Sequence, residues 1–278
     1  MKERVTLTIE KEILEKVDQS VNGSDVKNRS HAVELLLTKA FGENKPSKAI
    51  ILAGGKGARM KPMTNLLPKP MLRIQDKPIL EHNIELLKRH GIKDVIISVG
   101  YRGNKIKEHF GDGSQLGVNI KYIEEKTPLG TGGPLNLLKG KIDDTFLLMN
   151  GDELKEIDLE DMFLFHRKNK SMATIALTTV EDPSKYGVAV MNGNQIMTFI
   201  EKPSKDHAPS KLINAGLYIL EPEILKNIPE GFFMIENEIF PRLATNEKLL
   251  GYVFSGQWFD TGTPERFSEA ERGWQGLK

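Results

Sequence analysis

The sequence predicts an α/β protein in two parts: a small strand–helix–helix domain over residues 1–46, and a large domain over residues 47–278 with a mixed, mainly parallel sheet. Three observations support this prediction. Residues 42–47 carry no large apolar side chain, which is typical of a linker. After them, short apolar runs alternate with amphipathic segments, as expected for parallel strands joined by crossover helices. Beyond residue 172 the apolar runs are shorter and turn-rich, which favours antiparallel hairpins.

The first 46 residues contain one expected strand and two expected helices. Residues 4–9 alternate in polarity, and the apolar face of this strand carries Val5, Leu7 and Ile9. Apolar residues at helical spacing follow at Ile13, Leu14 and Val17. Ser30 is placed to cap a second helix. The inward face of that helix is expected to carry Ala32, Val33, Leu36, Leu37, Ala40 and Phe41. So small a segment cannot bury this much apolar surface alone, so we expect it to dimerise.

The order of these elements, with Asn28-Arg29-Ser30 before the second helix, resembles a ribbon-helix-helix domain over about residues 3–42. The resemblance implies that the strands of two chains pair into a ribbon. In that family the outward strand side chains, here Arg4, Thr6 and Thr8, enter the major groove of DNA. Residues 1–46 contain eight Lys/Arg and eight Asp/Glu, however, and a domain without net positive charge is a weak DNA reader. We therefore expect a homodimer or higher homo-oligomer through this domain, and regard DNA binding as the less favoured alternative.

In the large domain the apolar pattern predicts each element in turn. Parallel strands are expected at residues 49–53, 95–99, 118–122 and 146–149. Helices are expected at residues 78–90, 105–110 and 131–138. Later strands are expected at residues 173–179, 188–191, 196–200 and 212–220. The acidic stretch over residues 153–161 is expected to begin a solvated helix.

The composition excludes several functional classes. With no cysteine, the chain has no disulfide, no thiolate nucleophile and no cysteine-ligated metal. The 39 Lys+Arg and 38 Asp+Glu nearly balance, so the chain lacks the large positive charge that general nucleic-acid binding requires. No apolar run approaches the ~20 residues of a membrane span, and the first residues do not form an apolar signal segment, so we expect a cytoplasmic protein. The histidines are scattered without metal-ligand spacing and are expected at the surface or partly packed: His31, His82, His90, His109, His166 and His207.

A glycine-rich segment directly follows the first strand of the large domain. It consists of Leu52-Ala53-Gly54-Gly55-Lys56-Gly57-Ala58-Arg59. Glycines allow a sharp turn and present backbone N–H groups to phosphate oxygens, and the Arg59 guanidinium adds a bidentate fork. The spacing matches neither the dinucleotide-binding fingerprint nor the Walker A loop. Prolines on both sides of Lys69 restrict the loop that carries this second cation. The segment therefore predicts a phosphate-binding site of another kind.

Further motifs follow this segment in a fixed order. They are Pro68-Lys69-Pro70-Met71, Glu125-x-x-Pro128-Leu129-Gly130-Thr131, Asn150-Gly151-Asp152, Tyr186-Gly187-Val188, Glu201-Lys202-Pro203, Asn214-Ala215-Gly216 and Trp258-x-Asp260-x-Gly262-Thr263-Pro264. Over about residues 48–272 the set resembles the sugar-1-phosphate nucleotidyltransferase family. The resemblance implies a Rossmann-like α/β fold of the nucleotide-diphospho-sugar transferase type. The Pro-Leu-Gly-Thr-Gly-Gly form is most similar to guanylyltransferases for mannose or heptose 1-phosphates.

The resemblance also implies a role for each motif. It assigns nucleotide binding to Leu52, Ala53, Gly54, Gly55, Gly57, Glu125, Pro128, Gly130 and Thr131. It assigns sugar-phosphate binding to Gly187, Glu201, Lys202 and Asn214, and catalysis to the cations Arg59, Lys69 and Lys202. It makes Asp152 and Asp260 ligands of Mg²⁺, a cation that prefers hard oxygen donors. Where Ala58 stands the family usually has Thr, and neighbouring backbone N–H groups can compensate for the missing hydroxyl.

The implied reaction transfers a nucleoside monophosphate from a nucleoside triphosphate to a sugar 1-phosphate. A phosphate oxygen of the sugar attacks the α-phosphorus, and pyrophosphate leaves. The second pKa of a phosphate monoester is about 6, so the attacking group is mostly dianionic at neutral pH and needs no general base. Arg59 and Mg²⁺ are expected to neutralise the triphosphate, Lys69 to span the reacting phosphates, and Lys202 to hold the sugar phosphate. Glu201 is expected to accept hydrogen bonds from sugar hydroxyls.

GTP with mannose 1-phosphate or a related sugar fits the motif form best, although uridylyl-, thymidylyl- and cytidylyltransferases share most of the motifs. A competing hypothesis is a transcription regulator with a DNA-binding head and a nucleotide-sugar-sensing body that is catalytically weak. The nearly complete set of cations and carboxylates favours the enzyme.

Overall fold

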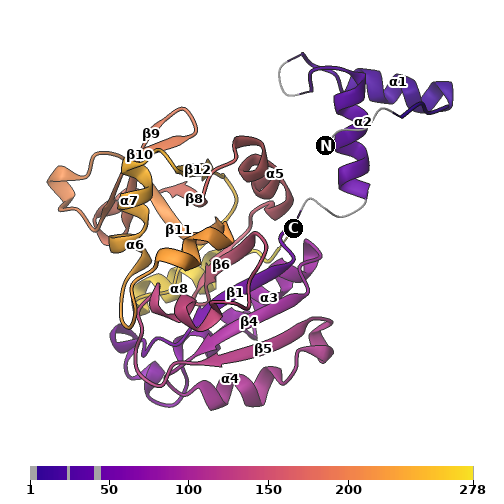
Figure 1. Cartoon of the computed structure of the whole chain (residues 1–278). Helices are drawn as coiled ribbons and strands as arrows, with labels where there is room; N and C mark the ends of the chain where they lie inside the picture. The colour runs from indigo at the N-terminus through magenta and orange to yellow at the C-terminus, as the bar shows by residue number, and fades with distance from the viewer. Residues whose placement is uncertain (1–4, 24–25, 41–44, 278) are drawn as a thin grey trace. The chain divides into compact units, whose positions relative to one another are not determined.

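The structure is a computed structural model that describes residues 5–23, 26–40 and 45–277. It divides into two compact units, Met1–Asn44 and Lys45–Lys278 (Figure 1). The linker predicted at residues 42–47 lies partly outside the described residues. Within them, every helix is too short or too polar to cross a membrane.

The first unit contains the two predicted helices, α1 (Lys11–Gln19) and α2 (Arg29–Ala40). The side chain of Asn28, not that of Ser30, caps α2, because its Oδ1 accepts a hydrogen bond from the backbone N–H of His31 at 2.9 Å. Only part of the apolar surface is covered within one chain. Val17 and Ala32 are buried, whereas the large aliphatic side chains that remain exposed are Val5, Leu7, Ile13, Leu36 and Leu37.

The strand predicted over residues 4–9 is not formed in the single chain. Residues 5–10 have no regular structure, and Arg4 lies outside the described residues. A strand needs a hydrogen-bonded neighbour, and within the described part of the chain no segment pairs with residues 5–10.

In the second unit, the described residues form a nine-stranded sheet in the order β5-β4-β1-β6-β11-β8-β12-β10-β9. The strands are β1 (Lys48–Ala53), β4 (Asp94–Val99), β5 (Asn119–Glu124), β6 (Phe146–Asn150), β8 (Ala173–Thr179), β9 (Gly187–Asn192), β10 (Gln195–Glu201), β11 (Leu212–Leu220) and β12 (Leu249–Val253). The first four in the sheet order are parallel. β11 is antiparallel to both β6 and β8, and β9 and β10 form an antiparallel hairpin. The sheet is therefore mixed, with a parallel half and a largely antiparallel half.

Among the described residues of this unit, two short strand pairs, six α-helices and several 3₁₀-helices accompany the sheet. The pairs are β2 (Arg73–Ile74) with β3 (Lys77–Pro78), and β7 (Glu153–Lys155) with β13 (Trp258–Asp260). The helices are α3 (Ile79–Arg89), α4 (Gly103–Phe110), α5 (Leu159–Asn169), α6 (Ile235–Glu238), α7 (Phe240–Thr245) and α8 (Pro264–Gly273). The helix predicted over residues 131–138 is a 3₁₀-helix, Gly133–Leu138. Its buried side chains Leu135 and Leu138 are three residues apart, a spacing that a 3₁₀-helix places on one face.

The prediction of a solvated helix start over residues 153–161 was wrong in its first part. Residues Glu153–Lys155 form β7, and α5 begins only at Leu159, where Asp158 caps it. The charged residues of this segment favoured a solvent-exposed helix. Instead, the segment pairs with β13, about 100 residues later in the chain. This pairing places Lys155 in the interior, where its side chain is fully buried. Tertiary pairing thus overrides the local pattern.

Apolar side chains cover both faces of the sheet. Along β1, Ala49 and Ile51 pack in the cluster that includes α3, α4 and α5, whereas Ile50 packs in the opposite cluster with α6 and α7. Because side chains alternate along a strand, a continuous apolar run is what a strand covered on both faces requires. Two histidines are also buried, contrary to expectation: His82 bonds the backbone oxygen of Ile74, and His166 bonds Thr174 and Glu221.

The strand order places a crevice where the candidate motifs lie. β1 lies between β4 and β6. The chain adds β4 and β5 on one side of β1 and then returns to add β6 on the other side, so the strand order reverses at β1. Ligands of open α/β sheets bind beyond the carboxyl ends of strands at such a point. The glycine-rich segment follows β1 there, and Asp152 follows β6.

Candidate active site

A single cavity of about 810 Å³ collects the predicted residues. Its wall includes every residue assigned above: Leu52, Ala53, Gly54, Gly55, Gly57, Arg59, Lys69, Glu125, Pro128, Gly130, Thr131, Asp152, Gly187, Glu201, Lys202, Asn214 and Asp260. Ala58 is not part of this wall. Segments far apart in the sequence therefore form one site of the size that holds a nucleotide-sized ligand.

The glycine-rich loop packs tightly against the Glu125 side chain. A Cβ atom on Gly54 would lie 2.1 Å from Glu125 Oε1, so a larger residue there would displace the Glu125 carboxyl group from this position. The carboxylate accepts hydrogen bonds from the Ser98 hydroxyl (2.8 Å) and the Leu129 backbone N–H (3.3 Å). Glu125 thereby connects the phosphate loop after β1 to the loop that carries Gly130.

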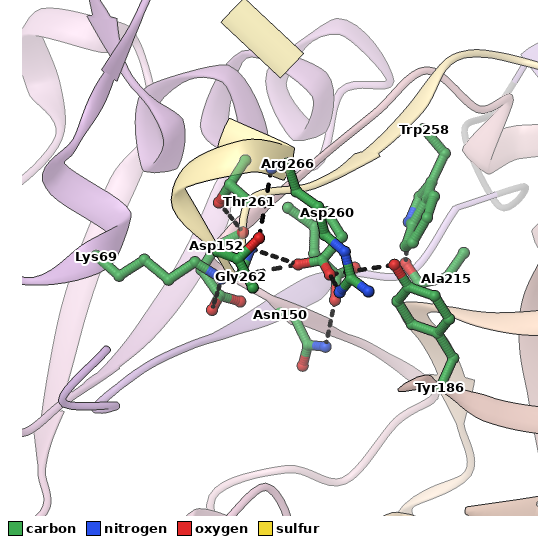
Figure 2. Close-up of polar contacts among 12 residues, drawn as sticks. Lys69, Asn150, Asp152, Tyr186, Ala215, Trp258, Asp260, Thr261, Gly262 and Arg266 are labelled. Carbon is green, nitrogen blue, oxygen red and sulfur yellow. Dashed lines mark hydrogen bonds and ion pairs between the residues drawn. The ribbon is translucent and has the colours of Figure 1, made fainter. Parts of the chain in front are cut away.

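The Lys69 ammonium group lies close to both candidate metal ligands, Asp152 and Asp260 (Figure 2). Its Nζ is 2.7 Å from Asp152 Oδ2 and 3.9 Å from Asp260 Oδ1. Burial alone would raise the pKa of Asp152, but the Lys69 ammonium group and its hydrogen bond lower it below its ordinary value. Asp152 is therefore a carboxylate at neutral pH.

Asp260 is fixed by several donors. Its Oδ1 accepts from the Gly262 backbone N–H at 2.7 Å, and its Oδ2 accepts from the Arg266 guanidinium and from the Tyr186 hydroxyl at 3.2 Å (Figure 2). Partial burial and then the charge of Asp260 raise the pKa of Tyr186 well above its ordinary value, so it remains a phenol that donates. Arg266 was not predicted, and the signal available in the sequence was its position two residues after the Trp258–Pro264 motif.

The donor set fits a divalent cation that also binds phosphates. Among the described residues, no group of three or more His, Asp or Glu side chains forms a complete metal cage. Asp152 and Asp260 instead converge on the same ammonium group, which marks a position where two carboxylates face one positive charge. Mg²⁺ usually takes one or two protein carboxylates and completes its shell with water and substrate phosphates.

The other end of the cavity combines an ion pair with a tight turn. Lys202 Nζ lies 2.7 Å from Glu201 Oε1, and the Lys202 backbone has a φ of 50°, an uncommon conformation for a residue other than glycine. A Cβ atom on Gly187 would lie 2.3 Å from the Phe199 ring and 2.9 Å from Glu201 Oε2, so the glycine leaves space for both side chains. Asn214 donates to the Tyr218 hydroxyl at 2.9 Å and accepts from the Gly216 backbone N–H.

A buried ion pair that sequence reasoning missed supports strand β11 at Gly216, where the pairing register shifts and the backbone φ is positive. Lys155 Nζ donates to the Gly216 backbone oxygen at 3.1 Å and lies 3.3 Å from Glu153 Oε2. Glu153 lines the cavity, and Asn150 donates to its other oxygen. Burial lowers the pKa of Lys155 and raises that of Glu153, although each charge partly offsets the effect on the other. No sequence signal separates this pair from surface charges, because only the pairing of β7 with β13 buries it.

Glu236 is a second cavity residue without a sequence signal. It is 6% exposed, and its Oε2 accepts a hydrogen bond from the Thr131 hydroxyl. The two residues are 105 positions apart in the sequence.

Comparisons with known proteins agree with this geometry. The profile of a family described as Nucleotidyl transferase matches residues 48–275. The mannose-1-phosphate guanylyltransferase of Mycobacterium tuberculosis is 39% identical over 224 residues, which cover 79% of this chain and 62% of that protein. The catalytic subunit beta of the mannose-1-phosphate guanylyltransferase of Danio rerio is 39% identical over 226 residues, with the same coverage. The chain thus spans less than two thirds of the length of these relatives.

Solved structures share the fold. The structure of UDP-glucose pyrophosphorylase complexed with UDP-glucose superimposes with a TM-score of 0.70 at 26% identity, and the match covers 81% of this chain and 97% of that one. The structure of HddC from Yersinia pseudotuberculosis complexed with GMP-PN gives a TM-score of 0.68 at 27% identity, covering 81% and 98%. Because the family profile extends over most of the sequence and the fold agrees, the chain belongs to the nucleotidyl transferase family.

Proposed function

We propose that the protein transfers a nucleoside monophosphate from a nucleoside triphosphate to a sugar 1-phosphate, releasing a nucleotide sugar and pyrophosphate. The observation that carries the proposal is the convergence of all predicted phosphate-binding, sugar-binding and acidic residues on one cavity. The bond that forms joins a sugar-phosphate oxygen to the α-phosphorus. The bond that breaks joins that phosphorus to the bridging oxygen of the pyrophosphate group, which leaves with the electron pair.

The chain's own residues supply position and positive charge. The loop after β1 offers backbone N–H groups to the triphosphate, and Arg59 neutralises part of its charge. Lys69 can exchange its contact with Asp152 for oxygens of the reacting phosphates, because its ammonium group already lies on the cavity wall. Lys202 holds the phosphate of the incoming sugar, and Glu201 accepts from sugar hydroxyls. Each such charged donor is worth on the order of 10²–10³ in rate.

Mg²⁺ is the proposed cofactor, with Asp152 and Asp260 as its protein ligands. When bound, it would neutralise charge on the triphosphate and on the departing pyrophosphate. Asp260 is held in place for this role by the Gly262 N–H, Arg266 and Tyr186.

We infer that GTP and mannose 1-phosphate, or a closely related sugar, are the substrates. The relatives named mannose-1-phosphate guanylyltransferase support this choice at about 39% identity. The test is pyrophosphate release from each of GTP, UTP, dTTP, CTP and ATP against a panel of sugar 1-phosphates.

For the first unit, we propose self-association with a second copy of the chain. Val5 and Leu7 precede α1 and are 68% and 56% exposed, and three further aliphatic residues of α1 and α2 are also exposed. Pairing of residues 4–9 across two copies would satisfy their backbone groups and cover this apolar surface, as in the ribbon-helix-helix arrangement that the sequence resembles.

Light scattering of the full chain and of a fragment beginning at Ser47 tests the self-association. We expect the full chain to form a dimer or larger oligomer and the fragment to form an assembly of fewer subunits. The fragment should retain transferase activity. The same subunit number in both would contradict the proposal. Tight, sequence-selective DNA binding at physiological salt would instead support the regulator hypothesis.

A further inference from the structure

The segment over residues 232–236 presents alternate side chains to the cavity. Phe232, Met234 and Glu236 line its wall, whereas Phe233 and Ile235 are buried in the apolar core. This alternation makes the segment a wall of the site, although none of the sequence motifs includes it.

The segment is fixed to the loop that carries the predicted nucleotide-binding residues. The Gly132 N–H donates to the Phe233 backbone oxygen at 3.0 Å, and the Phe233 N–H donates to the Leu129 backbone oxygen at 3.1 Å. A Cβ atom on Gly132 would lie 2.0 Å from a ring carbon of Phe233, so the two segments touch without space for a side chain. Such packing holds Glu236 in one position relative to Thr131.

The Glu236 carboxyl group has unused hydrogen-bonding capacity. A carboxylate offers about four acceptor positions. The Thr131 hydroxyl donates to Oε2, and the Glu236 backbone N–H is a second donor to the carboxyl group. Because Glu236 lines the cavity wall, the acceptor positions that these two donors leave open are available to a ligand. Burial raises the pKa of Glu236, and the hydrogen bond from Thr131 partly offsets this effect.

The neighbours of Glu236 show which part of a ligand it faces. Glu236 shares the cavity wall with Glu201, Lys202 and Asn214, and Thr131 of the nucleotide-binding loop hydrogen-bonds it. Glu236 therefore lies between the nucleotide loop and the predicted sugar end of the cavity. An acidic group there repels phosphate oxygens but accepts hydrogen bonds from hydroxyl groups.

We propose that Glu236 is a specificity-determining residue that hydrogen-bonds a hydroxyl group of the sugar ring. The inference rests on the proposed transferase function and deepens it, because Glu236 would be a second carboxyl group, besides Glu201, that hydrogen-bonds sugar hydroxyls. Thr131 is the positioning residue that orients the carboxyl group.

The experiment compares wild type, Glu236→Gln and the control Glu238→Gln. Glu238 lies two residues later on the same short helix, is exposed, and is not part of the cavity wall. The substrates are GTP with mannose 1-phosphate and with its 2-, 3-, 4- and 6-deoxy forms, and kcat/KM is measured by pyrophosphate release. Thermal unfolding of each variant shows whether it is folded, and Glu236→Asp replaces Glu236→Gln if the latter is not.

We expect Glu236→Gln to lower kcat/KM for mannose 1-phosphate by about 10–100-fold, the range for a lost hydrogen bond to a charged group. For one deoxy form the loss should be less than about 3-fold, because the hydroxyl that Glu236 reads is already absent from it. Glu238→Gln should match wild type. An equal loss for mannose 1-phosphate and every deoxy form, or no loss, would overturn the inference while leaving the transferase function intact. Wild-type protein that is inactive with every triphosphate and sugar 1-phosphate would overturn the proposed function itself.

Discussion

Replacing Lys155 with Met should destabilise the second unit more than any single change of a surface lysine. The side chain is fully buried, and it donates to the Gly216 backbone oxygen and faces Glu153 Oε2 at 3.3 Å. That oxygen has no hydrogen-bond partner among the described residues, so the Lys155 ammonium group is its nearest compensation. Methionine fills nearly the same volume but leaves the Glu153 charge and the Gly216 oxygen without a positive partner.

The size of the effect follows from these contacts. Removing one partner of a buried ion pair costs about 3–5 kcal/mol. For a unit of this size, 1 kcal/mol corresponds to roughly 2–4 °C, so the melting temperature should fall by about 6–20 °C. The double variant Lys155→Met/Glu153→Gln should recover most of the loss, because it removes the unpaired charge as well.

Urea and thermal unfolding followed by tryptophan fluorescence measure this effect. Both tryptophans, Trp258 and Trp274, lie in the second unit, so the signal reports its unfolding. Lys121→Met, a change at an exposed position of β5, is the matched control and should change the unfolding free energy by less than about 0.5 kcal/mol. If Lys155→Met changed the unfolding free energy by less than about 1 kcal/mol, the ion pair would not support the irregular part of β11 at Gly216.

Three further predictions concern the candidate active site and the buried His166. Asp152→Asn and Asp260→Asn should each lower kcat by about 10²-fold or more at a temperature where thermal unfolding shows the variant to be folded, and wild-type turnover that persists in EDTA would contradict the assigned metal ligands. Lys202→Ala should mainly raise KM for the sugar 1-phosphate, whereas Arg59→Ala should mainly lower kcat; a change in Lys202→Ala confined to the KM for the triphosphate would reverse the assignment. Burial lowers the pKa of His166, so its contribution to stability is complete above the ordinary pKa of about 6.5 and is lost as the pH falls below it. Urea midpoints between pH 7 and pH 5 should therefore fall more steeply for wild type than for His166→Gln, and parallel curves would show that His166 does not titrate with unfolding.

The sequence predicted those parts of the fold whose pattern is local. The apolar runs that became β1, β4, β6 and β11 are buried on both faces, and their length and flanking turns distinguish them from helices. The phosphate loop and Asp152 could be placed at strand ends because both directly follow such runs. The resemblance to a known family supplied the remaining site residues, and all of them line one cavity.

The parts that were missed depend on contacts between distant segments. The three-residue strand β7 contains two charged residues, and only its pairing with β13 shows that Lys155 is buried. Glu236 lies in a segment without a motif, and only the fold brings it to Thr131. The strand expected over residues 4–9 stays a prediction for two paired copies, because no segment in the described part of a single chain pairs with residues 5–10.

The most direct test of the proposed transferase activity is pyrophosphate release by the full chain with Mg²⁺, measured for five nucleoside triphosphates against several sugar 1-phosphates. The proposal predicts rapid release that requires both substrates together, is highest with GTP and mannose 1-phosphate or a related sugar, and stops when the metal is chelated. Release from a triphosphate at the same rate with and without a sugar 1-phosphate, or no release with any pair, would contradict it.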